Sequence, residues 1–132
     1  MNIGFLGLGK LGLPVSLAVE DKGHKVFGFD ISKQTINDIK NRKIRYKEEW
    51  VDKYLPNTKL EITDIDNLVK NSEIIFVPIQ TPHDPKYEGV TRIPEKRIDF
   101  DYTYLKSGIK DLSEAIEKNG EDKVVIIIST VL

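Results

Sequence analysis

A glycine-patterned turn near the start of the chain constrains its fold more than any other feature. The run 7–12 carries glycine at its first, third and sixth positions and follows the apolar run 2–6. A second apolar run, 25–29, ends in Asp30 about twenty residues farther on. Strand, tight turn, helix, second strand and acidic residue form the dinucleotide-binding fingerprint. The sequence therefore predicts a βαβ unit with a dinucleotide site at its turn.

Each residue type in this fingerprint has a mechanical task. Gly7 allows the sharp turn, Gly9 lets backbone N–H groups approach a diphosphate, and Gly12 lets the helix pack closely on the strand. The positive end of the helix dipole favours the same anion. The carboxylate of Asp30 can accept hydrogen bonds from a ribose diol and would repel a 2′-phosphate, which favours NAD over NADP. The simpler interpretation is that the glycines serve turns and packing only.

Composition excludes several classes of function. The 132 residues carry a net charge of −1, which argues against binding nucleic acid or a membrane surface by bulk electrostatics. No apolar stretch is long enough to span a bilayer, and Asn2 leads directly into a strand, leaving no room for a signal peptide. The absence of cysteine excludes a thiol nucleophile and fits a cytoplasmic location. His24 and His83 have no ligand spacing, so no metal site is predicted.

Strand and helix signals alternate along the chain, which predicts a parallel sheet with helices on both faces. The right-handed crossover rule gives the strand order 3-2-1-4-5 and a binding crevice between the first and fourth strands. The fold class is thus a Rossmann-type, doubly wound α/β sheet. The predicted strands are 2–6, 25–30, 59–63, 73–79 and 123–130, and the predicted helices are 10–22, 33–41, 64–71 and 102–118.

Two segments of the chain, and the outer edge of the predicted sheet, do not follow this alternation of strands and helices. The aromatic and apolar spacing in 42–56 predicts a short helix whose aromatic stripe docks on the sheet. The segment 80–100 is too long and irregular for a routine connection. The β-branched runs 73–79 and 123–130 predict strands covered on both faces. A sheet that stops at the fifth strand would still have an open edge, which predicts a homodimer unless the loop or the chain end covers it.

Hydroxyl side chains follow the fourth and fifth strands. Thr81 follows the fourth strand, and Ser129 and Thr130 end the fifth. Hydroxyls beside a glycine turn suit a phosphate, a ribose or a carboxamide. They could equally be a turn residue before proline and a strand terminus.

The whole chain resembles the N-terminal NAD-binding domain of the UDP-glucose/GDP-mannose 6-dehydrogenase family. The resemblance rests on several motifs that occur in order along the sequence. They are Gly7-Leu8-Gly9 through Gly12-Leu13-Pro14, Phe29-Asp30-Ile31, Thr81-Pro82, Asp99 or Asp101 with Tyr104, and Ser129-Thr130-Val131. The resemblance implies that residues 1–132 are a single Rossmann domain, truncated before the sixth strand and lacking the central helix and the sugar-binding domain.

The resemblance also implies an activity and a set of contacts. The family oxidises the C6 alcohol of a nucleotide sugar to a carboxylate, with NAD as the cofactor. It implies that Asp30 holds the adenosine ribose, and that Thr81 and Thr130 line the rest of the NAD cleft. The diphosphate would be held by Gly9, Lys10 and Leu11.

This chain departs from the family pattern at two positions beside the cofactor. Lys10 occupies a position where the family commonly has an aromatic residue, and its cation could approach the diphosphate. Thr35 occupies a position where the family often has a basic residue, and Lys33 could substitute. A Glu-Pro-Gly motif that the family has near 46–49 is missing.

The family's chemistry needs a cysteine, and the resemblance places it and its partners beyond Ser129-Thr130-Val131. No catalytic residue is therefore assigned, and the chain alone is predicted to be catalytically incompetent, with the nucleotide sugar bound only in an intact enzyme. Two alternatives stay open. One is the N-terminal domain of a β-hydroxyacid or 6-phosphogluconate-type dehydrogenase, against which Asp30 and Thr81-Pro82 argue. The other is a stand-alone NAD-binding or nucleotide-binding regulatory module, which fits equally well.

Overall fold

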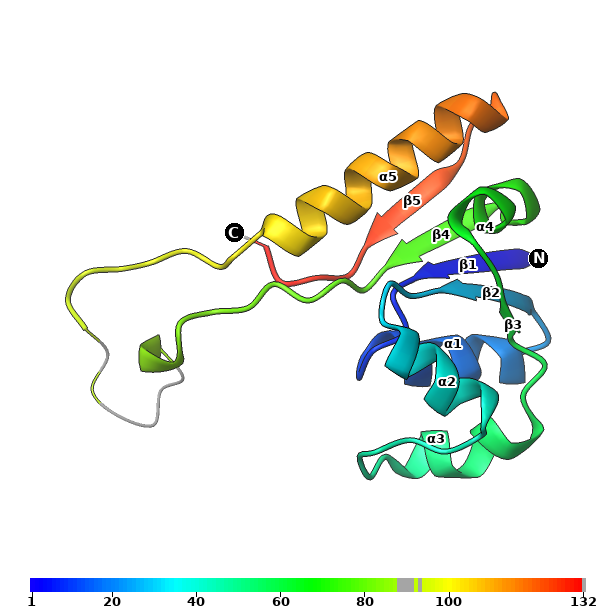
Figure 1. The fold of residues 1–132 in the computed structure, drawn as a ribbon, viewed down its shortest axis with the longest axis horizontal. Coiled ribbons are helices and arrows are strands. Elements are labelled where there is room, and N and C mark those ends of the chain that lie inside the picture. Colours follow the sequence, from blue (N-terminus) through cyan, green and yellow to red (C-terminus); the bar gives the residue numbers. More distant parts are fainter. Residues whose placement is uncertain (88–91, 93, 132) are drawn as a thin grey trace.

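A parallel five-stranded sheet forms the centre of the protein, in the predicted order β3-β2-β1-β4-β5 (Figure 1). The computed structural model describes residues 1–87, 92 and 94–131. Every strand pairing is parallel, with Leu6 opposite Phe29 and Val77 opposite Ile127 at the carboxyl ends. The strands are β1 (Asn2–Leu6), β2 (Lys25–Phe29), β3 (Glu61–Ile62), β4 (Ile74–Val77) and β5 (Val124–Ile127).

Two apolar clusters pack against the sheet. Consecutive strand residues enter different clusters: Phe5 and Val26 belong to one, and Leu6 and Phe27 to the other, as expected when side chains alternate across a strand. The first cluster includes residues of α1 and α3, and the second includes residues of α4 and α5. The helices are α1 (Gly12–Asp21), α2 (Lys33–Lys40), α3 (Glu49–Tyr54), α4 (Ile65–Asn71) and α5 (Thr103–Asn119), with 3-10 turns η1 (Leu55–Asn57) and η2 (Pro85–Tyr87).

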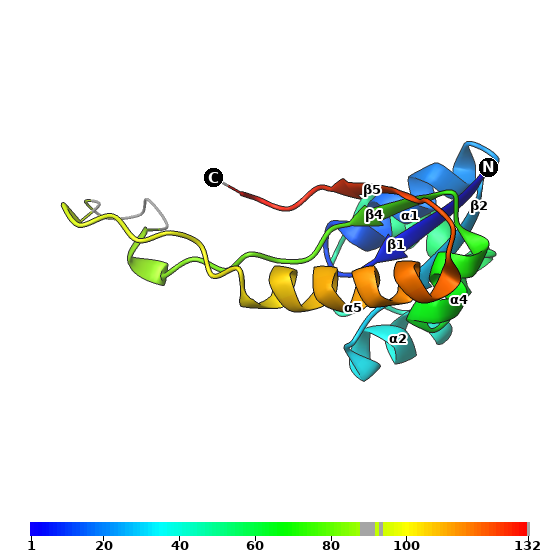
Figure 2. The same ribbon diagram turned by 90° about the horizontal axis from the view of Figure 1, so that it is seen from above.

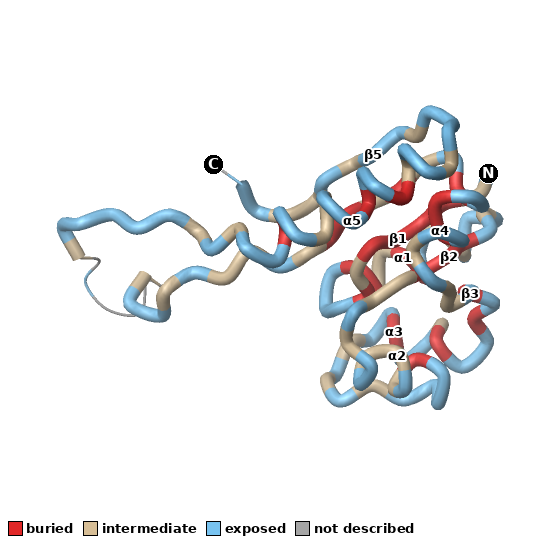
Figure 3. The backbone as a smooth tube through the Cα atoms, turned by 45° about the horizontal axis from the view of Figure 1, so that its top comes forward, coloured by how far each residue is buried: buried red, intermediate tan, exposed pale blue. Residues whose placement is uncertain are grey.

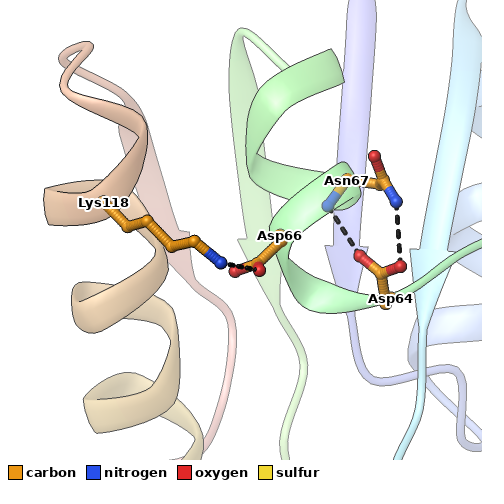
Figure 4. Close-up of polar contacts among 4 residues, drawn as sticks. All are labelled: Asp64, Asp66, Asn67 and Lys118. Atoms are coloured by element: carbon orange, nitrogen blue, oxygen red, sulfur yellow. Dashed lines mark hydrogen bonds and ion pairs between the residues drawn. The ribbon is translucent and has the colours of Figure 1, made fainter.

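Local side chains fix the ends of several helices. Ser32 caps α2, and its hydroxyl accepts a hydrogen bond from the Thr35 backbone N–H at 3.2 Å. Asp64 caps α4 through the backbone and side chain of Asn67, and Lys118 of α5 pairs with Asp66 of α4 (Figure 4). The Lys118–Asp66 pair joins α4 to α5, whose apolar residues share one core cluster.

The predicted docking of an aromatic stripe on the sheet is wrong. In α3 the aliphatic Val51 is buried and packs in the cluster that includes α1, and Leu55 follows it in η1. Trp50 is 51% exposed and stacks on Tyr54. Residues four apart share a helix face, so the aliphatic pair and the aromatic pair lie on neighbouring faces. The aliphatic face is buried, whereas on the aromatic face Tyr54 is partly buried against the same cluster and Trp50 is exposed.

The prediction that both late strands are covered on two faces is also wrong for β5. Val124 is 56% exposed, Val125 36% and Ile127 48%. Figure 3 shows much of β5 in the colour of exposed residues. Within the described residues, β5 pairs with β4 alone. A run of β-branched residues indicates that the backbone favours a strand. Whether that strand is buried depends on which other elements pack against it.

The described parts of the predicted irregular segment, 80–87 and 94–102, extend from the body as the two sides of a long arm (Figures 1 and 2). One side leaves the end of β4 and the other leads into α5. The Asp101 backbone N–H donates to the Pro82 carbonyl at 2.7 Å, which joins the two sides of the arm at its base. The ring of His83 meets Phe100 edge-on, with 6.3 Å between centroids. The arm thus has local contacts of its own, apart from the two core clusters.

Candidate dinucleotide site

The glycine turn follows β1 and lies against the end of β4. Gly7 has a φ of +117°, a backbone conformation that side chains disfavour, and its N–H donates to the Phe29 carbonyl at 2.8 Å. A Cβ at Gly12 would lie 2.1 Å from the Gly7 carbonyl oxygen and 2.8 Å from Pro78 Cγ. Backbone conformation therefore favours glycine at the first position, and packing requires it at the last.

Gly9 differs from both, because nothing in the described part of the chain requires a glycine there. Its φ is not positive, and a Cβ added to it would meet no described atom within 4 Å. The space beside Gly9 is open. A glycine at this position keeps the turn accessible to a ligand, which is the task expected of the second glycine in the fingerprint.

Backbone N–H groups at this turn are available to an anion. The carbonyls of Gly9 and Leu11 accept from the first turn of α1, at 3.0 and 3.3 Å. The N–H groups of Gly9, Lys10 and Leu11 find no acceptor among residues 1–87, 92 and 94–131. Unpaired N–H groups and the positive end of a helix dipole together favour a phosphate.

Asp30 links this turn to the start of α2. Its Oδ2 accepts from the Leu8 backbone N–H at 2.7 Å, and its Oδ1 accepts from the Ser32 backbone N–H at 2.8 Å. An ionised carboxylate has about four acceptor positions, so about two stay open for hydroxyl groups. The contact with Leu8 was not predicted, because it joins residues 22 positions apart.

Two exposed side chains lie beside Asp30. Ile31 is 89% exposed, and Lys33 is exposed at the start of α2. Ile31 was not among the predicted site residues, although an apolar residue directly after the acidic one was a signal in the sequence. Lys10 is likewise exposed at the turn. Both lysines are thus free to reach solvent near the open amides or the carboxylate.

The structure brings the hydroxyl residues after β4 and β5 together. The Thr81 hydroxyl donates to the Thr130 carbonyl at 2.8 Å, and Ser129 Oγ lies within hydrogen-bond distance of the Val77 and Ile79 carbonyls. These contacts connect the segment after β5 to the end of β4 and to the residues that follow it. Because the Thr81 proton is already used, its oxygen can offer only lone pairs to a ligand.

Other kinds of site are absent from the described residues. Among them, no group of three or more His, Asp or Glu side chains could hold a metal ion. No described helix is both long and apolar enough to cross a membrane.

Comparison with known proteins points to one family. The model described as "UDP-glucose/GDP-mannose dehydrogenase family, NAD binding domain" matches residues 1–132. A UDP-N-acetyl-D-mannosamine dehydrogenase of Pyrococcus horikoshii is 29% identical over 99% of this chain and 29% of its own length. Protein CapL of Staphylococcus aureus is 40% identical over 63% of this chain and 19% of its own length.

Solved structures agree with the sequence matches. A ternary complex of GDP-mannose dehydrogenase from Pseudomonas aeruginosa superposes with a TM-score of 0.80 at 26% identity, covering 100% of this chain and 29% of that one. The UDP-D-ManNAc dehydrogenase of Pyrococcus horikoshii gives 0.73 at 28% identity, covering 99% and 29%. The chain thus spans less than a third of the length of each of these relatives.

Proposed function

Because the chain belongs to the UDP-glucose/GDP-mannose dehydrogenase family and spans its NAD-binding domain, we propose that it binds NAD across the crevice between β1 and β4. The observation that carries this proposal is the open turn, where three successive N–H groups lack an acceptor among the described residues. The enzyme it serves would oxidise the C6 alcohol of a nucleotide sugar to a carboxylate.

The cofactor would lie with its diphosphate on the amides of Gly9, Lys10 and Leu11. Asp30 would accept from the adenosine ribose, and the exposed Ile31 offers an apolar contact for the adenine. The ends of β4 and β5, with Thr81 and Thr130, would line the nicotinamide half. Lys10 would add a cation near the diphosphate, and Lys33 would replace the basic residue that the family has beyond the aspartate.

NAD supplies the hydride acceptor, and the residues of this chain bind and orient it. Hydride transfer needs the alcohol held about 3–3.5 Å from the acceptor carbon. We assign no described side chain to that task, and the 132 residues contain no cysteine. We therefore expect them to bind NAD without oxidising a nucleotide sugar on their own. NADH formation from UDP-glucose by the purified protein would contradict this expectation.

A titration of the protein with NAD, NADP and ADP-ribose tests the cofactor proposal. NAD and ADP-ribose should bind, since both carry the diphosphate and an unmodified adenosine ribose. NADP should bind at least about tenfold more weakly, because its 2′-phosphate would meet the Asp30 carboxylate. Equal affinity for NAD and NADP would contradict the role of Asp30, and no binding of any of the three would contradict the proposal.

We also propose that the protein self-associates through β5. Val124, Val125 and Ile127 are exposed, and the outer backbone edge of this strand pairs with no described residue. An uncharged, apolar edge strand favours pairing with another strand. The cytoplasmic location, and the absence of nucleic-acid and membrane partners, stay predictions of the sequence.

A further inference from the structure

The glycine turn is held in place by β2 as well as by its own strand. The Gly7 N–H donates to the Phe29 carbonyl at 2.8 Å, and the Leu8 N–H donates to Asp30 Oδ2 at 2.7 Å. The Leu8 side chain is only 1% exposed, and a Cβ added to Gly28 would lie 2.7 Å from its Cδ1. The end of β2 therefore holds the start of the turn: Phe29 contacts Gly7, and both Gly28 and Asp30 contact Leu8.

The turn changes character directly after these contacts. Within the turn, Leu8 is the last residue whose N–H donates to a protein acceptor, and the N–H groups of Gly9, Lys10 and Leu11 have none in the described chain. Leu8 is anchored at its backbone by Asp30 and at its buried side chain, so the chain that carries the next three N–H groups starts from a fixed residue. Anchoring Leu8 thus limits the positions that the amides available to the diphosphate can reach.

Asp30 is the charged partner in this arrangement. A hydrogen bond to an ionised carboxylate is shorter and stronger than one between neutral groups. The second carboxylate oxygen accepts from the Ser32 N–H at 2.8 Å, so the group is held from both sides. It could not rotate toward a ligand without losing one of these two backbone contacts.

From this geometry we propose that Asp30 is a positioning residue for the diphosphate in addition to an acceptor for the ribose. Its carboxylate couples the two halves of the site, because one group orients the turn and contacts the sugar. The inference rests on the proposed binding of NAD at this crevice. It differs from a ribose-only role in one measurable respect: Asp30 should matter even to a ligand without ribose hydroxyls.

The experiment compares ADP with 2′,3′-dideoxy-ADP on the full chain, the Asp30→Asn variant and the Asp30→Ala variant. Asparagine offers one acceptor oxygen where the carboxylate offers two, and alanine offers none. We expect ADP affinity to fall about ten- to a hundredfold in Asp30→Ala. Dideoxy-ADP affinity should fall about three- to tenfold in the same variant, with Asp30→Asn between it and the unmodified protein.

Asp38→Asn provides a matched control for the lost carboxylate. Asp38 lies on α2, and its contacts are with Gln34 and Arg45 rather than with the turn. This variant should bind both ligands as the unmodified protein does. If Asp38→Asn weakened dideoxy-ADP binding as much as Asp30→Ala does, the effect would not depend on the contact with Leu8, and the inference would fail.

Amide hydrogen exchange of Leu8 in the unliganded protein gives a readout that does not depend on a ligand. It should quicken in Asp30→Ala and not in Asp38→Asn, while amides in the core strand β1 stay protected in both. A dideoxy-ADP affinity unchanged by Asp30→Ala, together with unchanged Leu8 exchange, would overturn the inference and leave NAD binding intact. Failure of the unmodified protein to bind either nucleotide would instead overturn both proposals.

Discussion

The hydroxyl of Thr81 donates a hydrogen bond to the carbonyl of Thr130 at 2.8 Å, and this contact ties the residues after β4 to those after β5. The two residues are 49 positions apart, and the arm and α5 lie between them in the sequence. Two residues that we propose for the nicotinamide half of the site thus also hold that half together.

Thr81→Val should loosen this end of the crevice. Valine keeps the shape of threonine but cannot donate, so the free energy of unfolding should fall by about 0.5–1 kcal/mol. NAD affinity should fall as well, whereas Thr81→Ser should retain most of both. Chemical denaturation and calorimetric titration measure the two effects. Equal behaviour of the valine and serine variants would show that the hydroxyl has no such role.

Substitutions at Gly9 and Gly12 should separate binding from folding. Gly9→Val puts a side chain into open space, so it should abolish NAD binding and leave the thermal unfolding midpoint nearly unchanged. Gly12→Ala should lower that midpoint strongly, because its Cβ would lie 2.1 Å from a backbone oxygen. Calorimetry with NAD and thermal unfolding check both. Unchanged NAD affinity in Gly9→Val would remove the diphosphate from this turn.

Stability should fall in acid partly through Asp64. Hydrogen bonds from the Asn67 backbone and side chain lower the pKa of this carboxyl below its ordinary value. A lowered pKa in the folded state adds stability above the unfolded-state pKa, and this stability is lost as the pH falls through the folded-state pKa.

Asp64→Asn keeps a good capping residue but removes the titration. Its free energy of unfolding should therefore depend less steeply on pH below about 4 than that of the unmodified protein. Denaturation curves at several pH values between neutrality and acid measure the slope. Parallel slopes in the two proteins would mean that Asp64 does not contribute.

A charge on β5 should weaken the proposed self-association. Ile127 is 48% exposed on this edge strand, and Ile127→Lys would place an ammonium where a second copy is expected to pair. Analytical ultracentrifugation should give a concentration-dependent dimer for the unmodified protein and mainly monomer for the variant. A monomer at high concentration in both would contradict the proposed interface.

Local patterns carried most of the fold prediction. The glycine spacing at 7–12, followed by a second strand ending at Asp30, fixed the first βαβ unit, because each element there depends on neighbours in the chain. The strand order followed from the handedness of crossovers, which depends on chain geometry more than on particular side chains.

Burial and long-range partners were decided by the tertiary structure. Val124 and Val125 have the sequence of a covered strand and are exposed, while Trp50 is exposed beside the buried Val51. The hydrophobicity of a residue indicates that it favours burial, but the packing of elements distant in the sequence determines which residues are covered.

The sequence by itself thus determined where the glycine turn forms and which residue types surround it. Only the tertiary structure decided that Asp30 holds Leu8, that Thr81 holds Thr130, and that the N–H groups of Gly9, Lys10 and Leu11 have no acceptor in the described part of the chain. The sequence specifies the chemical type of the side chain at each position. The partner of that side chain depends on the packed sheet, which brings the ends of distant strands within hydrogen-bond distance.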